Sequence, residues 1–226
     1  SISTVSRAVS LVGFAGIRNM ALSLVLLEHM HDKEHANQLK EDFLRLLMAG
    51  SIASELCASQ RDGEEAFIGA MFQNLGRLLT EYYFPDEAEQ VRGMVRADAQ
   101  QSPATPKCEL EQNASVKVLG RSVEALGLGV GRSGGLPDTL LRCMTRPQGV
   151  PPPLRLDKPA ERLRWVALAA NEITDALLKA VPGASSQAVA SVAEPFQRAL
   201  GLTVREMQAA AITAQVSNGR TVAEMP

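Results

Sequence analysis

The chain has 226 residues, a mass of 24.2 kDa and a formal net charge of −2, with a pI near 6.0. A net charge this close to zero argues against the strongly basic surface that a nucleic-acid-binding domain needs. The longest apolar run, 20–27, is far too short to cross a bilayer, and the N-terminal residues lack a signal-peptide layout. We therefore expect neither a membrane nor a nucleic-acid partner.

Apolar residues recur at helical spacing along nearly the whole chain, and no segment alternates as a half-buried strand would. This pattern predicts an all-α fold, a multi-helix bundle. In chain order, the helices are expected at 3–12, 15–30, 37–58, from 62 to the residues before Pro85, and then at 86–99, 109–126, 136–144, around 163–177, and at 185–200 and 203–216.

Local signals set several of these boundaries. Asp62-x-x-Glu65 and Thr203-x-x-Glu206 match the capping box, which satisfies the free N–H groups at a helix start. We expect loops at 100–107 and at the glycine-rich stretch 127–135. Residues 145–157 contain four prolines and a glycine and form the clearest linker, which separates a helical core over 1–150 from a C-terminal helical part over 151–226.

The three cysteines of the chain form no metal-binding or redox pattern. Cys57, Cys108 and Cys143 lie far apart, and no Cys-x-x-Cys occurs. A reducing compartment permits such a set. We therefore expect a cytoplasmic location.

One expected helix carries an adjacent polar pair followed by a glycine. Residues 69–79 read Gly-Ala-Met-Phe-Gln-Asn-Leu-Gly-Arg-Leu-Leu, with the pair at Gln73 and Asn74. The segment resembles the Gly-Leu-Leu-His-Asp-Ile-Gly-Lys core of the HD hydrolase superfamily, in which the His-Asp doublet holds a metal. Gln is a poor substitute for imidazole, and Asn for a carboxylate, at a divalent transition-metal site.

Three further blocks, in order, resemble HDOD domains, the HD-related output domains of bacterial signalling. They are Ser6-Arg-Ala-Val-Ser-Leu-Val-Gly-Phe-Ala-Gly-Ile-Arg-Asn-Met-Ala-Leu22, Glu65-Ala-Phe-Ile-Gly-Ala70 and Leu136-Pro-Asp-Thr-Leu140. The resemblance covers roughly residues 2–145 and implies an HDOD-type bundle, with the family's opening helices expected upstream of Ser1. It further implies an output or adaptor role, with other signalling proteins or covalently linked input domains as partners.

The departures from HD enzymes concern the metal ligands. Further histidines of those enzymes would fall at 46–48 and 145–147, and another is often found near 116–120, yet none of these stretches contains one. The resemblance therefore implies a degenerate metal site, with no catalytic residue, no bound metal and no cofactor.

Two interpretations of Gln73 and Asn74 stay open. They form buried hydrogen bonds that replace the metal as internal struts, or they line a relic pocket that senses a nucleotide such as a cyclic dinucleotide. Arg77, in the place of the family's usual lysine, suits either role. A residual metal-dependent phosphohydrolase with non-standard ligands is the remaining alternative.

Two other motifs have competing explanations. His29, His31 and His35 are clustered in the sequence. His31 and His35, four residues apart, could bind Zn²⁺ with Asp32 or Glu28 on a continuing helix, or the cluster forms a solvated helix end. The Gly129-x-Gly131-x-x-Gly134 pattern matches a dinucleotide fingerprint by letter, but an expected helix precedes it where a strand is required. We therefore expect a flexible loop there.

A non-catalytic domain must act through its surface. The candidate surfaces are the C-terminal helices and the two loops, because loops on a rigid scaffold often hold binding residues. Arg162, Arg164 and Trp165 stand together on one of these helices, and Trp and Arg are enriched at binding hot spots. Trp165 also suits a core position, and the sequence leaves that choice open together with the oligomeric state.

Overall fold

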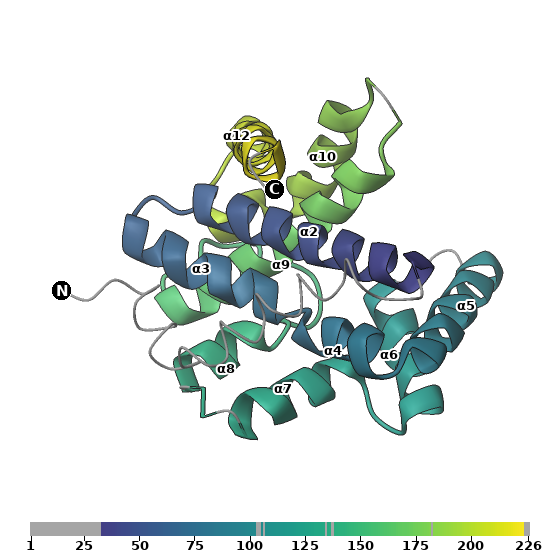
Figure 1. Cartoon of the computed structure of the whole chain (residues 1–226). Helices are drawn as coiled ribbons and strands as arrows, with labels where there is room; N and C mark the ends of the chain where they lie inside the picture. The colour runs from purple at the N-terminus through teal and green to yellow at the C-terminus, as the bar shows by residue number, and fades with distance from the viewer. Residues whose placement is uncertain are drawn as a thin grey trace.

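The computed structural model describes residues 33–102, 105, 107–133, 135–136, 138–181 and 183–223. Within these ranges all regular structure is helical, so the expected all-α fold is confirmed (Figure 1). The elements are α2 Lys33–Glu55, α3 Gln60–Phe72, α4 Leu75–Tyr83, α5 Pro85–Gln101, α6 Lys107–Leu119, α7 Val123–Ser133, α8 Asp138–Met144, α9 Pro159–Lys179, α10 Ser185–Ala193, the 3-10 helix η1 Glu194–Phe196, α11 Gln197–Leu200 and α12 Val204–Ala223.

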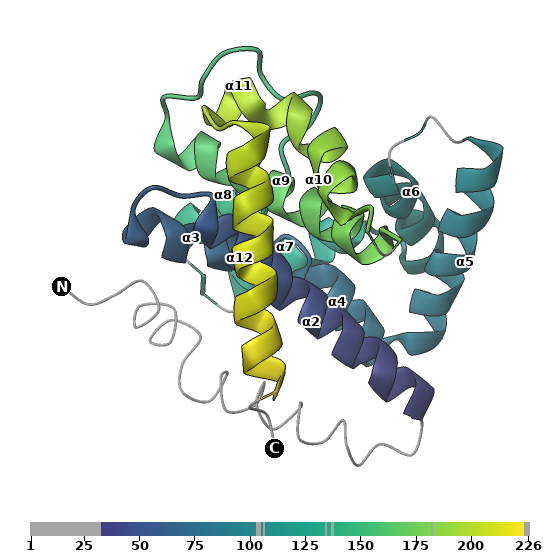
Figure 2. The same ribbon diagram turned by 90° about the horizontal axis from the view of Figure 1, so that it is seen from above.

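Helix α9 runs through the middle of the molecule and organises its core (Figure 1). It contacts α2, α3, α8 and α10, while α12 packs on α2 and α10 (Figure 2). The apolar face expected on this helix is buried from Leu163 to Ile173, and Leu177 is partly buried. Helices α2, α3, α9, α10 and α12 therefore share one core, although the proline-rich linker lies between α8 and α9.

The two expected capping boxes have different outcomes. At α12 the prediction is confirmed, since Glu206 N–H donates to Thr203 Oγ1 over 3.2 Å and Thr203 N–H donates to Glu206 Oε2 over 2.7 Å. At α3 the cap lies three residues earlier than predicted. Ser59 has an extended backbone and its Oγ accepts from the Asp62 N–H over 3.1 Å, so Asp62 lies in the first turn.

The predicted helix 109–126 and the loop 127–135 both require correction. The backbone turns at Gly120, whose φ of +74° is a conformation that favours glycine, and α6 ends just before it. A new helix then runs to Ser133, with Ser122 Oγ accepting from the Ala125 N–H over 3.1 Å. Gly129 and Gly131 therefore lie inside α7, which is incompatible with a phosphate-binding loop, while Gly134 lies outside the described residues.

Gly76 brings α4 and α7 into backbone contact directly beside the polar pair. A Cβ atom at Gly76 would overlap the carbonyl oxygen of Val123 and lie 2.9 Å from the backbone nitrogen of Gly127. No side chain fits between these helices at this point. The glycine that follows the doublet is thus needed for the packing that closes one side of it.

No helix in the described ranges is both long enough and apolar enough to pass through a lipid bilayer.

Candidate functional site

Gln73 and Asn74 lie at the break between α3 and α4, not within one helix as predicted. The Gln73 N–H still donates to Gly69 O over 3.0 Å, whereas Asn74, with φ −111° and ψ 9°, interrupts the helical run. Their exposed fractions are 5% and 2%. Both carboxamides therefore need partners inside the protein.

Each polar atom of the Gln73 side chain has a partner from a distant segment. Its Nε2 donates to the carbonyl oxygens of Cys143 over 3.2 Å and Arg164 over 3.3 Å. Its Oε1 accepts from Asn171 Nδ2 over 3.3 Å. Gln73 therefore ties α3 to the end of α8 and to α9.

Asn74 is held from two sides. Its Nδ2 donates to Asn171 Oδ1 over 2.6 Å, and its Oδ1 accepts from Arg146 Nη2 over 2.7 Å. Asn171 also donates to Ala70 O over 3.1 Å and to Ala167 O over 2.9 Å. Gln73, Asn74 and Asn171 form one network of buried amides, which we call the amide network.

Two arginines supply positive charge to the amide network. Arg146, from the segment after α8, donates to Asn74, and burial lowers the pKa of its guanidinium below the ordinary value. Arg45, from α2, donates to Asn171 Oδ1 over 3.3 Å and pairs with Asp175 over 2.7 Å. A protein guanidinium thus lies against Asn74, the residue in the position of the metal-binding aspartate of HD enzymes.

The residues around Gln73 and Asn74 do not fit a divalent metal. All three carboxamide oxygens of the amide network already accept hydrogen bonds, and the Arg146 charge would repel a second cation there. Among the described residues, no three His, Cys, Asp or Glu side chains are grouped as a metal site would need. The cluster His29, His31 and His35 lies outside the side chains that the structure describes.

The relic pocket itself has almost no free space. The cavity lined by Gln73, Asn74 and Arg146 has a volume of about 10 Å³. That is about the volume needed to hold one water molecule. A nucleotide cannot enter it without displacing the amide network.

Arg77 forms the wall between this filled pocket and a larger cavity. Its guanidinium makes two hydrogen bonds to the Glu111 carboxylate on α6, of 2.6 and 2.7 Å. Burial alone would raise the pKa of Glu111, but the charge of Arg77 and its hydrogen bonds hold that pKa below the ordinary value. The pair therefore stays ionised at neutral pH and fixes α4 to α6.

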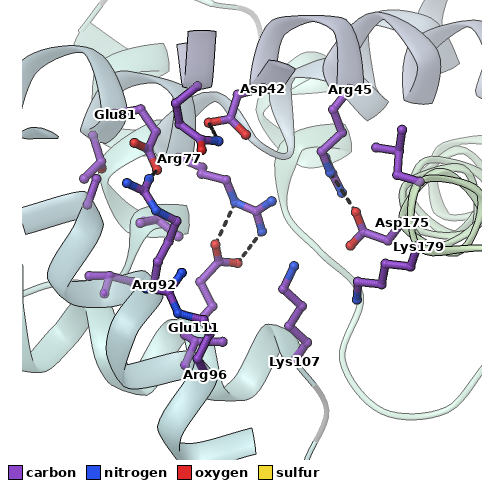
Figure 3. A pocket seen from close by; sticks show the side chains of 17 residues that line it. Asp42, Arg45, Arg77, Glu81, Arg92, Arg96, Lys107, Glu111, Asp175 and Lys179 are labelled. Carbon is purple, nitrogen blue, oxygen red and sulfur yellow. Dashed lines mark hydrogen bonds and ion pairs between the residues drawn. The ribbon is translucent and has the colours of Figure 1, made fainter. Parts of the chain in front are cut away.

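The larger cavity has a volume of about 360 Å³ and lies between α2, α4, α5, α6 and the end of α9 (Figure 3). Six basic side chains and four acidic ones line it, among them Arg77, Glu111 and Asp175. No sequence motif indicated this cavity, because its residues come from six helices, α7 supplying Val123.

Within the candidate surface Arg162, Arg164 and Trp165, the structure favours the core position that the sequence left open for Trp165. Trp165 is only 4% exposed and packs edge-on against Phe196, with ring centroids 6.3 Å apart. Arg162 donates to Leu200 O over 3.0 Å, and Arg164 donates to Thr145 O over 3.0 Å. The two arginines therefore connect α9 to the backbone of other segments. Neighbouring helices cover α9 on several sides, so Trp165 belongs to the core.

A different group of aromatic residues is exposed. Tyr82, Tyr83 and Phe84 follow one another at the turn from α4 to α5, and all three are large apolar residues open to solvent, with Tyr83 at 65%. The two tyrosine rings contact each other edge-on, 4.8 Å between centroids. The sequence offered a signal for this patch, since these are three consecutive aromatic residues in a chain that is only 4% aromatic.

Comparison with known families gives one match. The family model described as the HDOD domain matches residues 1–150. No match was found among curated proteins or among solved structures.

Proposed function

Because the chain belongs to the HDOD domain family, an HD-related family associated with signalling, we propose that it is a non-catalytic output or adaptor domain of bacterial signal transduction that acts by binding other proteins. One observation carries this proposal. Where HD enzymes have metal ligands, this chain has Gln73 and Asn74, joined through Asn171 and hydrogen-bonded to Arg146. We propose the cytoplasm as its location, supported by the unpatterned cysteines.

The chemistry of the amide network supports the non-catalytic role. Metal-dependent phosphohydrolases use a bound metal to lower the pKa of the attacking water and to polarise the phosphate. Here the corresponding amides are engaged with each other and with a guanidinium, so they act as struts between α3, α8 and α9. The relic cavity of about 10 Å³ likewise gives no support to nucleotide sensing at this place.

The aromatic patch Tyr82, Tyr83 and Phe84 is the proposed partner-binding surface. Tyrosine combines a large apolar ring with a hydroxyl, and tyrosines are enriched in the centres of protein interfaces. The patch lies on the turn into the α5–α6 hairpin, which stands at one end of the molecule in both views (Figures 1 and 2). A signalling protein or a linked input domain can therefore reach it.

This surface can be tested before the partner is identified. A photo-reactive phenylalanine analogue at position 83 is expected to cross-link a discrete partner protein in cells that naturally produce the chain. The same analogue at position 212 is the matched control, because Ile212 is an exposed apolar residue on α12. Adding Tyr82→Ala and Phe84→Ala is expected to remove the cross-linked product, since hot-spot truncation costs about 2 kcal/mol or more, a loss of at least tenfold in affinity.

Equal cross-linking at positions 83 and 212, or a product that survives the two alanine substitutions, would exclude this surface. Unchanged far-UV circular dichroism of each variant is required, so that lost binding is not confused with unfolding.

A further inference from the structure

The 360 Å³ cavity has an excess of positive charge in a protein that is negative overall. Its six basic and four acidic lining side chains contrast with a net charge of −2 for the whole chain. Three of the acids are already paired with arginines, as Arg45–Asp175, Arg77–Glu111 and Arg92–Glu81. These pairs hold the walls of the cavity but leave other cations available.

Of the three remaining cations, Arg96 pairs with Glu89 outside the cavity lining, and the other two are lysines. Lys107 begins α6 and Lys179 ends α9, and among the described residues neither has a carboxylate within 4.0 Å. Figure 3 shows the Lys107 ammonium between the carboxylates of Glu111 and Asp175, facing into the cavity. Desolvation by neighbouring protein atoms lowers the pKa of Lys107 below its ordinary value; Arg77 and Lys179 add to that shift, whereas Asp175 and Glu111 oppose it. Both lysine side chains remain open to solvent at the mouth of the cavity. A bound anion would relieve the repulsion between these cations.

The fourth acid interacts with arginines of the cavity wall. Asp42, on α2, accepts one long hydrogen bond of 3.4 Å from Gln38 Nε2. Burial raises the pKa of Asp42, and the charges of Arg77, Arg45 and Arg92 oppose that shift. With six basic and four acidic side chains, the lining of the cavity has an excess of two formal positive charges.

We infer that this cavity binds a small molecule that carries a phosphate group. A phosphate monoester has a charge of about −1.5 to −2 at pH 7 and three acceptor oxygens, which matches two ammonium groups better than a single carboxylate does. Lys107 and Lys179 bind the phosphate, while the guanidinium of Arg77 is kept in place by Glu111. The volume lies at the lower end of the range for small-molecule sites, about 300–1,000 Å³.

The rest of the ligand lies against an apolar wall. Val91 and Val95 of α5, Val123 of α7 and Leu178 of α9 line the cavity beside the charged groups. A ring or short chain attached to the phosphate would contact them. The site is separate from the amide network, from which the Arg77–Glu111 pair divides it.

Isothermal titration of the whole chain with pyrophosphate, ADP, adenosine and citrate tests this inference. Pyrophosphate and ADP are both expected to bind, or ADP alone if the apolar wall is needed, whereas adenosine is not. Lys107→Gln and Lys179→Gln are each expected to weaken binding about tenfold, because a hydrogen bond to a charged group has about that value. Lys117→Gln is the matched control, since Lys117 is exposed on α6 and does not line the cavity.

Three results would overturn the inference. The first is no binding of either phosphate compound by the unchanged chain. The second is adenosine or citrate binding as tightly as ADP, which would remove the role of phosphate. The third is a loss of affinity in Lys117→Gln equal to that in the two cavity variants, which would place the anion elsewhere.

Discussion

Replacing Trp165 with alanine is expected to lower the free energy of unfolding by about 3–5 kcal/mol, the usual cost of truncating a buried aromatic side chain. The indole is 4% exposed and contacts Phe196, so its loss leaves a void between α9 and η1. Urea denaturation followed by circular dichroism measures the change. The sequence alone allowed a different outcome, lost partner binding with the helices intact, but a buried indole offers no surface to a partner.

Trp165→Phe is the matched control for this prediction. It keeps an aromatic ring against Phe196 and is expected to cost clearly less than the alanine variant. If Trp165→Ala changed the stability by less than about 0.5 kcal/mol, as substitutions at exposed positions do, Trp165 would not be a core residue.

Replacing Asn171 with leucine is expected to lower the free energy of unfolding by about 2–5 kcal/mol. Leucine has a similar size, so the main effect is the loss of hydrogen bonds. Gln73 Oε1 loses its donor and Asn74 Nδ2 loses its short acceptor, and each unsatisfied buried group costs about 1–3 kcal/mol. Urea titration at pH 7 gives the change.

Asn113→Leu provides the same substitution at an exposed site, on α6. It is expected to change stability by no more than about 0.5 kcal/mol. Similar losses in the two variants would show that the buried amides contribute nothing specific, and the role of the amide network as a strut would be wrong.

Local signals were sufficient to predict much of the fold. Helical spacing gave the all-α class, and Pro85 and Thr203 marked helix starts that the structure confirms. The break at Gly120 was not predicted, because a glycine inside a helical pattern shows its left-handed conformation only in the folded chain. Ser59 was not predicted as a cap, because the sequence analysis placed the helix start at Asp62, which the structure places in the first turn of α3.

The site was predictable only where its residues are neighbours in sequence. Gln73 and Asn74 were identified because they stand where the HD hydrolase motif has its His-Asp doublet. Asn171, in contrast, is a single polar residue on the buried face of α9, 97 positions beyond Asn74. Which side chains satisfy a buried amide depends on the packing of distant helices, and no local pattern contains that information.

Measuring the metal content of the purified chain shows whether the relic site can still hold a metal. The tag-free protein is incubated with Mn²⁺, Fe²⁺, Ni²⁺ or Zn²⁺, dialysed and analysed for metal, alongside a variant with His29, His31 and His35 changed to Gln. Only substoichiometric traces are expected in that variant, since the amide network and Arg146 occupy the relic site. Stoichiometric metal that persists in the histidine variant and is lost on Asn74→Ala would contradict the account and restore a metal-dependent phosphohydrolase.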